Sequence, residues 1–189
     1  MILIFFGPPG AGKGTQAKFV SDELNLIHLS TGEMLRNQLK KQNDLTEELK
    51  KNMDSGQLVS DAILNQIVLE RISEKDCENG YIFDGYPRTL TQAHFIDKYF
   101  LENNTAIDFF LEFKLNTDDI IKRITNRAKV EKRKDDNVNI IKTRLDKYYL
   151  ETKPVIEHYK KLYDSAYHIV EGNQEIQQIN KLLLNYLKK

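Results

Sequence analysis

The chain has 189 residues, of which 40% are hydrophobic, so it is long enough for one domain with its own core. Its 28 basic and 28 acidic residues give no net charge, which argues against a chain drawn as a whole to nucleic acid or to a membrane surface. The apolar runs are too short to cross a bilayer, no charged segment precedes the first one, and the single cysteine excludes an internal disulfide, so we expect a cytoplasmic protein without a signal peptide.

The first predicted element is a strand over residues 1–6, where six apolar residues suit a strand buried on both faces of a parallel sheet. Four glycines and Lys13 follow within residues 7–15, and apolar residues at helical spacing then predict a helix over 16–24. In this setting glycines let backbone N–H groups surround an anion, and the helix N-terminus adds partial positive charge. The segment therefore predicts a site for the phosphates of a nucleoside triphosphate, with Lys13 reaching the outer ones.

Four more short apolar segments predict strands, over residues 26–29, 80–83, 107–113 and 167–170. The helices predicted between and after them are 30–43 with Ser30 or Thr31 as cap, 45–53, 61–73, 89–101, one capped by Thr117, one from Asp135 that is kinked or restarted at Pro154, and one capped by Asn173. This alternation predicts a doubly wound, five-stranded parallel sheet of the α/β class. Polar residues at the carboxyl ends of its strands should then meet at one edge, where such sheets bind ligands.

Arginines could neutralise two phosphate chains at that edge, because a guanidinium pairs with phosphate oxygens through two hydrogen bonds. The candidates are Arg88, Arg123, Arg127, Arg133 and Arg144. For Arg123 and Arg127 taken alone, a solvated helix face is the favoured explanation. No general base is needed if the attacking group is a monophosphate, whose second pKa of about 6 leaves it mostly dianionic at pH 7.

Taken in order, these segments resemble the adenylate kinases, a branch of the nucleoside monophosphate kinases. Gly14, where the general phosphate loop has Ser or Thr, and then Thr15 are also typical of that family. The matching segments are 7–15, 29–36, 56–59, 84–89, Gln92, Arg123, Arg127, 133–137 and Arg144. The resemblance covers essentially the whole chain. It implies a single domain of residues 1–189, with a core of 1–29, 60–127 and 134–189, a helical insert for the nucleoside monophosphate at 30–59, and a short lid loop at about 128–133.

The resemblance implies reversible transfer of the γ-phosphoryl group of ATP to AMP, giving two ADP. The residues it places at ATP are Gly10, Ala11, Gly12, Lys13, Gly14, Thr15, Arg127 and Gly172. Those it places at AMP are Thr31, Arg36, Gln57, Leu58, Val59, Gly85, Tyr86, Pro87, Arg88, Gln92, Arg133 and Arg144. The catalytic residues it implies are Lys13, Arg88, Arg123, Arg133 and Arg144. Mg²⁺ would arrive with ATP and be held through water near Asp84 and Thr15.

The choice of acceptor rests on two residues. Thr31 and Gln92 resemble the adenylate pattern, whereas related pyrimidine monophosphate kinases tend to carry Ala and Asn there. A glutamine amide can offer both a donor and an acceptor to adenine, although an exposed polar residue on a helix is the simpler explanation of Gln92 alone. A kinase for UMP, CMP or GMP therefore stays the nearest alternative.

Two other classes of protein fit less well. A non-catalytic nucleotide-binding switch should carry an Asn-Lys-x-Asp run, and a nucleic-acid motor should have a second phosphate-sensing domain and a basic face; the sequence has none of these. Only five residues separate Arg127 from Arg133, and Cys77 is the single cysteine, so we expect a short lid without a four-ligand zinc site. We expect a monomer that binds nucleotides and neither nucleic acid nor membranes.

Overall fold

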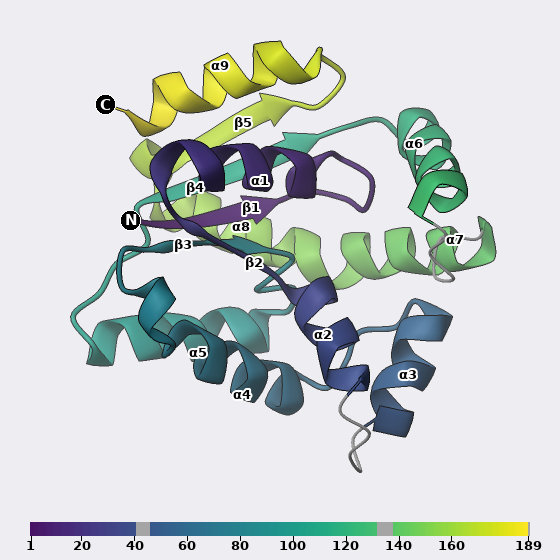
Figure 1. The fold of residues 1–189 in the computed structure, drawn as a ribbon, viewed down its shortest axis with the longest axis horizontal. Coiled ribbons are helices and arrows are strands. Elements are labelled where there is room, and N and C mark those ends of the chain that lie inside the picture. The colour runs from purple at the N-terminus through teal and green to yellow at the C-terminus, as the bar shows by residue number, and fades with distance from the viewer. Residues whose placement is uncertain (41–45, 132–137, 189) are drawn as a thin grey trace.

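The computed structural model describes residues 1–40, 46–131 and 138–188, and its centre is a five-stranded parallel sheet (Figure 1). The strands are β1 (Ile2–Phe6), β2 (Ile27–Ser30), β3 (Tyr81–Asp84), β4 (Phe109–Lys114) and β5 (Tyr167–Glu171). They lie in the order β2-β3-β1-β4-β5, and every neighbouring pair is parallel. The predicted doubly wound sheet is therefore confirmed, with the first strand at its middle.

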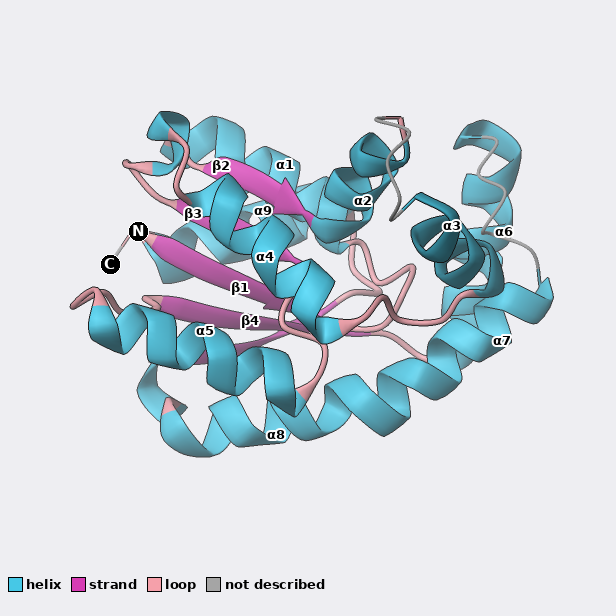
Figure 2. Ribbon diagram, turned by 90° about the horizontal axis from the view of Figure 1, so that it is seen from below, coloured by secondary structure: helices cyan, strands magenta, loops and turns pink. Residues whose placement is uncertain are grey.

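The two faces of the sheet carry separate apolar layers, because successive side chains of a strand point to opposite faces. Residues Ile2, Ile4 and Phe6 of β1 belong to one layer, and Leu3 and Phe5 belong to the other. The first layer packs against α4 (Asp61–Ile72), α5 (Leu90–Glu102) and α8 (Lys153–Leu162). The second packs against α1 (Lys13–Leu24) and α9 (Ile176–Leu187), and Figure 2 shows these two helices behind the strands. Burial on both faces explains the unbroken apolar run of β1.

Four helices lie beyond the carboxyl ends of the strands, at the side of the molecule opposite its two termini (Figure 1). They are α2 (Thr31–Leu39), α3 (Thr46–Ser55), α6 (Thr117–Glu131) and α7 (Val138–Lys147). A π-helical turn, η2 (Tyr148–Thr152), joins α7 to α8, and short 3₁₀ turns occupy Lys75–Cys77 and Asp164–Ala166. Because α3 also contacts α7, the helices after β2 and after β4 form two walls that meet.

Two predicted helix caps are wrong, and a third lacks its capping bond. The side chain of Asn116, not that of Thr117, accepts the hydrogen bond from the N–H of Asp119, at 2.8 Å, and Thr117 is already the first helical residue. Helix α9 begins at Ile176 after Glu175, so Asn173 does not cap it. Ser30 occupies the N-cap position of α2, as predicted, but its side chain makes no capping hydrogen bond. For α6, the polar residue one position earlier than predicted serves as the cap.

The segment predicted as a lid loop begins within a helix, because α6 continues to Glu131. Residues 132–137, which include Arg133, lie outside the described part of the chain. Pro154 stands in the first turn of α8, directly after the π-helical turn. That position suits proline, whose missing N–H would have no partner there. Within the described residues, no helix is both long enough and apolar enough to span a membrane.

Candidate active site

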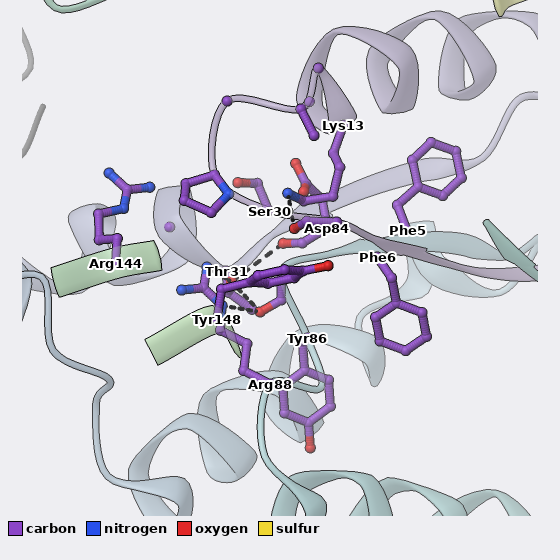
Figure 3. Close-up of a pocket in the computed structure, with 18 of the residues that line it drawn as sticks. Phe5, Phe6, Lys13, Ser30, Thr31, Asp84, Tyr86, Arg88, Arg144 and Tyr148 are labelled. Atoms are coloured by element: carbon purple, nitrogen blue, oxygen red, sulfur yellow. Dashed lines mark hydrogen bonds between the residues drawn. The ribbon is translucent and has the colours of Figure 1, made fainter. Parts of the chain in front are cut away.

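A cleft of about 1040 Å³ opens at the carboxyl ends of the strands. Its walls come from the glycine-rich loop after β1, helices α2 and α3, the turn after β3, helices α6 and α7, and the loop after β5. Figure 3 shows Lys13, Asp84, Thr31 and Arg88 around one space, with Arg144 at its side. This is the place where open α/β sheets bind ligands.

Every predicted site residue that falls in the described part of the chain lines this cleft. On the predicted donor side these are Gly10, Ala11, Gly12, Lys13, Gly14, Thr15, Arg127 and Gly172. On the predicted acceptor side they are Thr31, Arg36, Gln57, Leu58, Val59, Gly85, Tyr86, Pro87, Arg88, Gln92 and Arg144. Asp84 and Arg123 line it as well. The remaining predicted residue, Arg133, lies outside the described residues.

The cleft concentrates positive charge, although the whole chain is neutral. The basic side chains that line it are Lys13, Lys18, Arg36, Arg88, Arg123, Arg127, Arg144 and Lys147, and the acidic ones are Glu33 and Asp84. A concave surface with this excess of one charge attracts the opposite charge strongly. The cleft is therefore suited to polyanions.

The glycine-rich loop lies tightly against α6. Gly10 has a φ of +80°, and a Cβ placed on it would come within 2.8 Å of Cγ1 of Ile124. Only glycine satisfies both the backbone conformation and the close approach. The loop ends at the N-terminus of α1, which starts at Lys13, so its backbone N–H groups and the helix dipole face the same space.

Lys13 is half-buried and folded back onto its own loop. Its Nζ donates hydrogen bonds to the carbonyl oxygens of Gly7, at 2.8 Å, and Pro8, at 3.0 Å. The pKa of Lys13 is lowered from 10.5 to about 8, chiefly by burial and also by the charges of three arginines, while the negative charge of Asp84 opposes the change. The ammonium group is thus cationic at neutral pH but held in a site that would be more favourable with an anion present.

Asp84, the last residue of β3, places a carboxylate in the lining of the cleft, close enough for its charge to act on Lys13. Its Oδ2 lies 3.1 Å from Nε2 of His28, which comes from the neighbouring strand β2. Burial alone would raise the pKa of Asp84, but the hydrogen bond with His28 and the charge of Lys13 outweigh it, so the pKa lies below its usual value of 3.8. The carboxylate is therefore negatively charged at neutral pH.

The turn after β3 holds Arg88 across the cleft from Lys13. Its Nε donates to the carbonyl oxygen of Gly85 at 2.7 Å, and its Nη2 lies 3.5 Å from Oγ1 of Thr31. Its own carbonyl accepts from the hydroxyl of Thr152 at 3.1 Å. Burial and the nearby charge of Arg144 lower the pKa of Arg88 to about 10, which leaves it cationic at neutral pH. A buried cation with free donors on its guanidinium is a site for an anion.

Two arginines of α6 and α7 complete the positive wall. Nη2 of Arg123 donates to the carbonyl oxygen of Gly172 at 2.7 Å, which ties α6 to the loop after β5. Arg144, in the last turn of α7, packs beside Gly56, where a Cβ would come within 3.1 Å of its Cγ. The α7 wall therefore lies directly against the end of α3.

Gln92 lies in the first turn of α5 and is fully buried at the wall of the cleft. Its Oε1 accepts from the backbone N–H of Arg88 at 2.7 Å, and its Nε2 donates to Oδ1 of Asp61 at 2.7 Å. Since no part of the side chain is exposed, a ligand reaches this amide only when neighbouring side chains shift.

Comparison with known proteins agrees with this arrangement. The sequence model of one family, "Adenylate kinase", matches residues 5–163. The chain belongs to the adenylate kinase family. Among its relatives is the adenylate kinase of Acholeplasma laidlawii (strain PG-8A), 39% identical, with 99% of this chain and 98% of that protein aligned. Those of Petrotoga mobilis and Francisella philomiragia are 38% and 36% identical, with 100% of this chain aligned in both cases, against 98% and 100% of those proteins.

Membership of the adenylate kinase family makes the protein a phosphotransferase, and the positive cleft is the candidate site of that reaction. Some residues of this site were not predicted. They are His28 beside Asp84, Asp61 beside Gln92, Thr152 on the carbonyl of Arg88, and Tyr148. The first three each bond to a residue that is distant in sequence, so no local motif could have identified them.

The residues at the base of the phosphate loop are compatible with a hard cation that is carried by a nucleotide. Within residues 1–40, 46–131 and 138–188, no group of three His, Cys, Asp or Glu side chains is placed to hold a metal ion. A carboxylate at Asp84 and a hydroxyl at the exposed Thr15 nevertheless line one cleft. Mg²⁺ needs only one or two protein oxygens when substrate phosphates and waters supply the rest. This donor set therefore fits an Mg²⁺–nucleotide complex.

Proposed function

We propose that this protein transfers the γ-phosphoryl group of ATP to AMP, giving two ADP, and that the reaction is reversible. The observation that carries the proposal is that the glycine-rich loop with Lys13 and the pocket of Thr31, Arg88 and Gln92 line the same cleft. Its volume of about 1040 Å³ is at the upper end of the roughly 300–1,000 Å³ of a pocket for one small ligand. Two nucleotides can therefore face each other there.

On the donor side, the loop N–H groups and the N-terminus of α1 bind the ATP phosphates. Lys13 stabilises the negative charge of the transferred phosphoryl group. In the free protein Lys13 donates to two carbonyls of its own loop, at 2.8 and 3.0 Å, so it is pre-positioned at the loop rather than extended into solvent. Phosphate oxygens replace these carbonyl partners and relieve the cost of keeping a buried ammonium charged. Arg127 and Gly172 complete the donor side.

On the acceptor side, Arg88 binds the phosphate of AMP. Its Nε is already bonded to the carbonyl of Gly85 at 2.7 Å, so the guanidinium is oriented before the ligand arrives. The AMP phosphate is mostly dianionic at pH 7, since its second pKa is about 6, and it can attack without a general base. Thr31, Arg36, Gly85, Tyr86, Pro87 and residues 57–59 surround the rest of AMP.

Charge neutralisation is the main catalytic contribution of this site, because phosphoryl transfer needs little covalent help from the protein. Two anionic phosphate chains must be brought to within bonding distance. Lys13, Arg88, Arg123 and Arg144 line the space between the two sides, and the family resemblance adds Arg133. Fixed cations in a partly dehydrated cleft stabilise the spread charge of the transition state more than they stabilise either reactant.

An Mg²⁺ ion carried by ATP would offset the charge of the donor phosphates. The residues that would hold it are Asp84 and Thr15, acting through water. Asp84 is fitted for this role because its lowered pKa keeps the carboxylate charged, and its bond to His28 at 3.1 Å fixes its direction.

We further propose that residues 30–59 and a short lid at about 128–133 close over the nucleotides, while the rest of the chain stays as the core. The alignments with two of the relatives run over 214 and 215 positions, more than the 189 residues of this chain, so those relatives carry residues that this chain lacks. This length difference supports a short lid. We also propose that the protein is a cytoplasmic monomer. Sedimentation velocity on the purified protein would test its oligomeric state.

A panel of acceptors tests the function. With ATP and Mg²⁺ fixed, ADP formation is measured with AMP, UMP, CMP and GMP. We expect AMP to have a kcat/KM at least about 100-fold above each of the others, since a buried amide left without its partner is costly. A preference for UMP or CMP would overturn the choice of acceptor. No ADP with any of the four would overturn the assignment as a kinase.

A further inference from the structure

A closed set of hydrogen bonds surrounds the amide of Gln92. Its Nε2 donates to Oδ1 of Asp61 at 2.7 Å, and its Oε1 accepts from the backbone N–H of Arg88 at 2.7 Å. The other oxygen of Asp61, Oδ2, accepts from the hydroxyl of Thr89 at 3.0 Å. That hydroxyl oxygen in turn accepts from the backbone N–H of Gln92 at 3.1 Å. Asp61 begins α4 and Thr89 caps α5, so the set joins the starts of two helices.

The polarity of these bonds permits one orientation of the amide. The N–H of Arg88 can only donate and the carboxylate of Asp61 can only accept. Turning the amide by 180° would place Oε1 against a carboxylate oxygen and the NH₂ group against an N–H. Both contacts would be repulsive, and the side chain is fully buried, so water could not replace the lost partners.

We propose that Asp61 is a positioning residue that makes the acceptor site select 6-aminopurines over 6-oxopurines. This inference rests on the proposed function, in which Gln92 contacts the base of the monophosphate. After its bonds to Asp61 and Arg88, the amide retains one N–H and one lone pair of Oε1. The N–H is a donor and the lone pair is an acceptor, and both are presented to the edge of the base in a fixed order.

That order distinguishes adenine from hypoxanthine. Adenine offers an N–H donor at its 6-amino group and an acceptor at N1. Hypoxanthine offers the reverse, an acceptor at O6 and a donor at N1. An amide held in one orientation pairs with the first edge and meets the second with donor against donor and acceptor against acceptor. A glutamine that could turn freely would accept both, so selectivity depends on what holds the amide.

The replacement Asp61→Asn changes this restraint with almost no change in shape. The hydroxyl of Thr89 accepts from Gln92 and therefore donates to residue 61. It would keep the oxygen of the new amide facing Thr89 and turn the new NH₂ group toward Gln92. That group now favours the reversed amide of Gln92, although the N–H of Arg88 still favours the original one. Asp61→Asn is therefore expected to relax selectivity toward IMP.

The experiment measures kcat/KM for AMP and for IMP at saturating ATP, in the wild-type protein and in Asp61→Asn. We expect the ratio of IMP to AMP to rise by at least about tenfold, with KM for AMP affected more than kcat. The matched control is Asp97→Asn, which alters a carboxylate outside the cleft that accepts from the hydroxyl of Tyr159 at 2.7 Å. It should leave the ratio unchanged even if it lowers stability.

An unchanged ratio of IMP to AMP in folded Asp61→Asn would overturn the proposal, because loss of a purely structural role would lower kcat/KM equally for both substrates. Circular dichroism melting establishes that the variant is folded at the assay temperature. If it is not, Asp61→Ser supplies the same test, since a hydroxyl can also donate to a reversed amide, and it must raise the ratio too. If the wild-type protein makes no ADP from ATP and AMP, the proposed function itself is contradicted. The wild-type assay therefore distinguishes failure of the proposed function from failure of the role of Asp61.

Discussion

Replacing Gly85 by alanine should disrupt the acceptor side of the cleft through a short, calculable chain of effects. Gly85 has a φ of +85°, and a new Cβ would lie 2.7 Å from Nη2 of Arg88 and 2.8 Å from Oγ1 of Thr31. The backbone conformation costs an alanine about 1–2 kcal/mol. Arg88 must also move, which weakens its 2.7 Å bond to the carbonyl of Gly85 and costs about another 1–2 kcal/mol.

We therefore expect Gly85→Ala to lower the free energy of unfolding by about 2–4 kcal/mol, measured by urea denaturation followed by circular dichroism. Because Arg88 is displaced by an ångström or so, kcat/KM for AMP should fall by about 10². Binding of ATP alone, measured by calorimetry, should change by less than about threefold, since the donor side does not contact Gly85.

The matched control is Gly80→Ala. Gly80 has a φ of +117°, and its new Cβ would collide with the backbone of Met1, away from the cleft. This variant should lose at least as much stability but keep wild-type kinetics wherever it is folded. If Gly85→Ala retains its kcat/KM for AMP, or if Gly80→Ala loses it, then the placement of Arg88 by this turn is not what the reaction requires.

Three further results are expected. The pKa of Lys13 is about 8, so in the free protein its ammonium group loses a proton as the pH rises through 8. Because ATP binds the protonated form, the Kd for ATP should increase above pH 8 by up to about tenfold per pH unit. This increase should be absent in Lys13→Met. Gln16 is 2% exposed and its Oε1 has no hydrogen-bond partner within the described residues, so Gln16→Leu should raise the free energy of unfolding by about 1 kcal/mol, whereas Gln16→Ala, which leaves a cavity, should not. A two-adenosine polyphosphate that spans both sides should slow hydrogen exchange in α2 and α3 more than in β1, and equal protection of all three would argue against closure of residues 30–59.

The sheet was predictable because its strands are short apolar segments between polar ones. β1 is buried on both faces, with no residue more than 7% exposed, and such a strand leaves an unambiguous pattern. The position of the site followed from the sheet, because the carboxyl ends of all strands of a parallel sheet lie at the same edge. The order of the strands did not follow, since pairing between β1 and β4 joins residues more than 100 positions apart.

Contacts between distant residues account for what the sequence could not predict. The bond from Gln92 to Asp61 spans 31 positions, and that between His28 and Asp84 spans 56. Nothing near Asp61 distinguishes it from an ordinary acidic residue in the first turn of a helix. Two predicted caps, Thr117 and Asn173, were wrong for a different reason. Ser, Thr and Asn all favour that position, so the rule restricts a helix start to a few residues without choosing among them.

The central claim is that one cleft binds two nucleotides and moves a phosphoryl group between them in either direction. The most direct measurement starts from ADP and Mg²⁺ alone and follows the nucleotides by ³¹P NMR. We expect ATP and AMP to appear in equal amounts, to reach the same mixture that forms from ATP and AMP, and to do so about 10³-fold more slowly in Lys13→Met. Persistence of ADP unchanged, or its conversion to products that include free phosphate, would contradict the account.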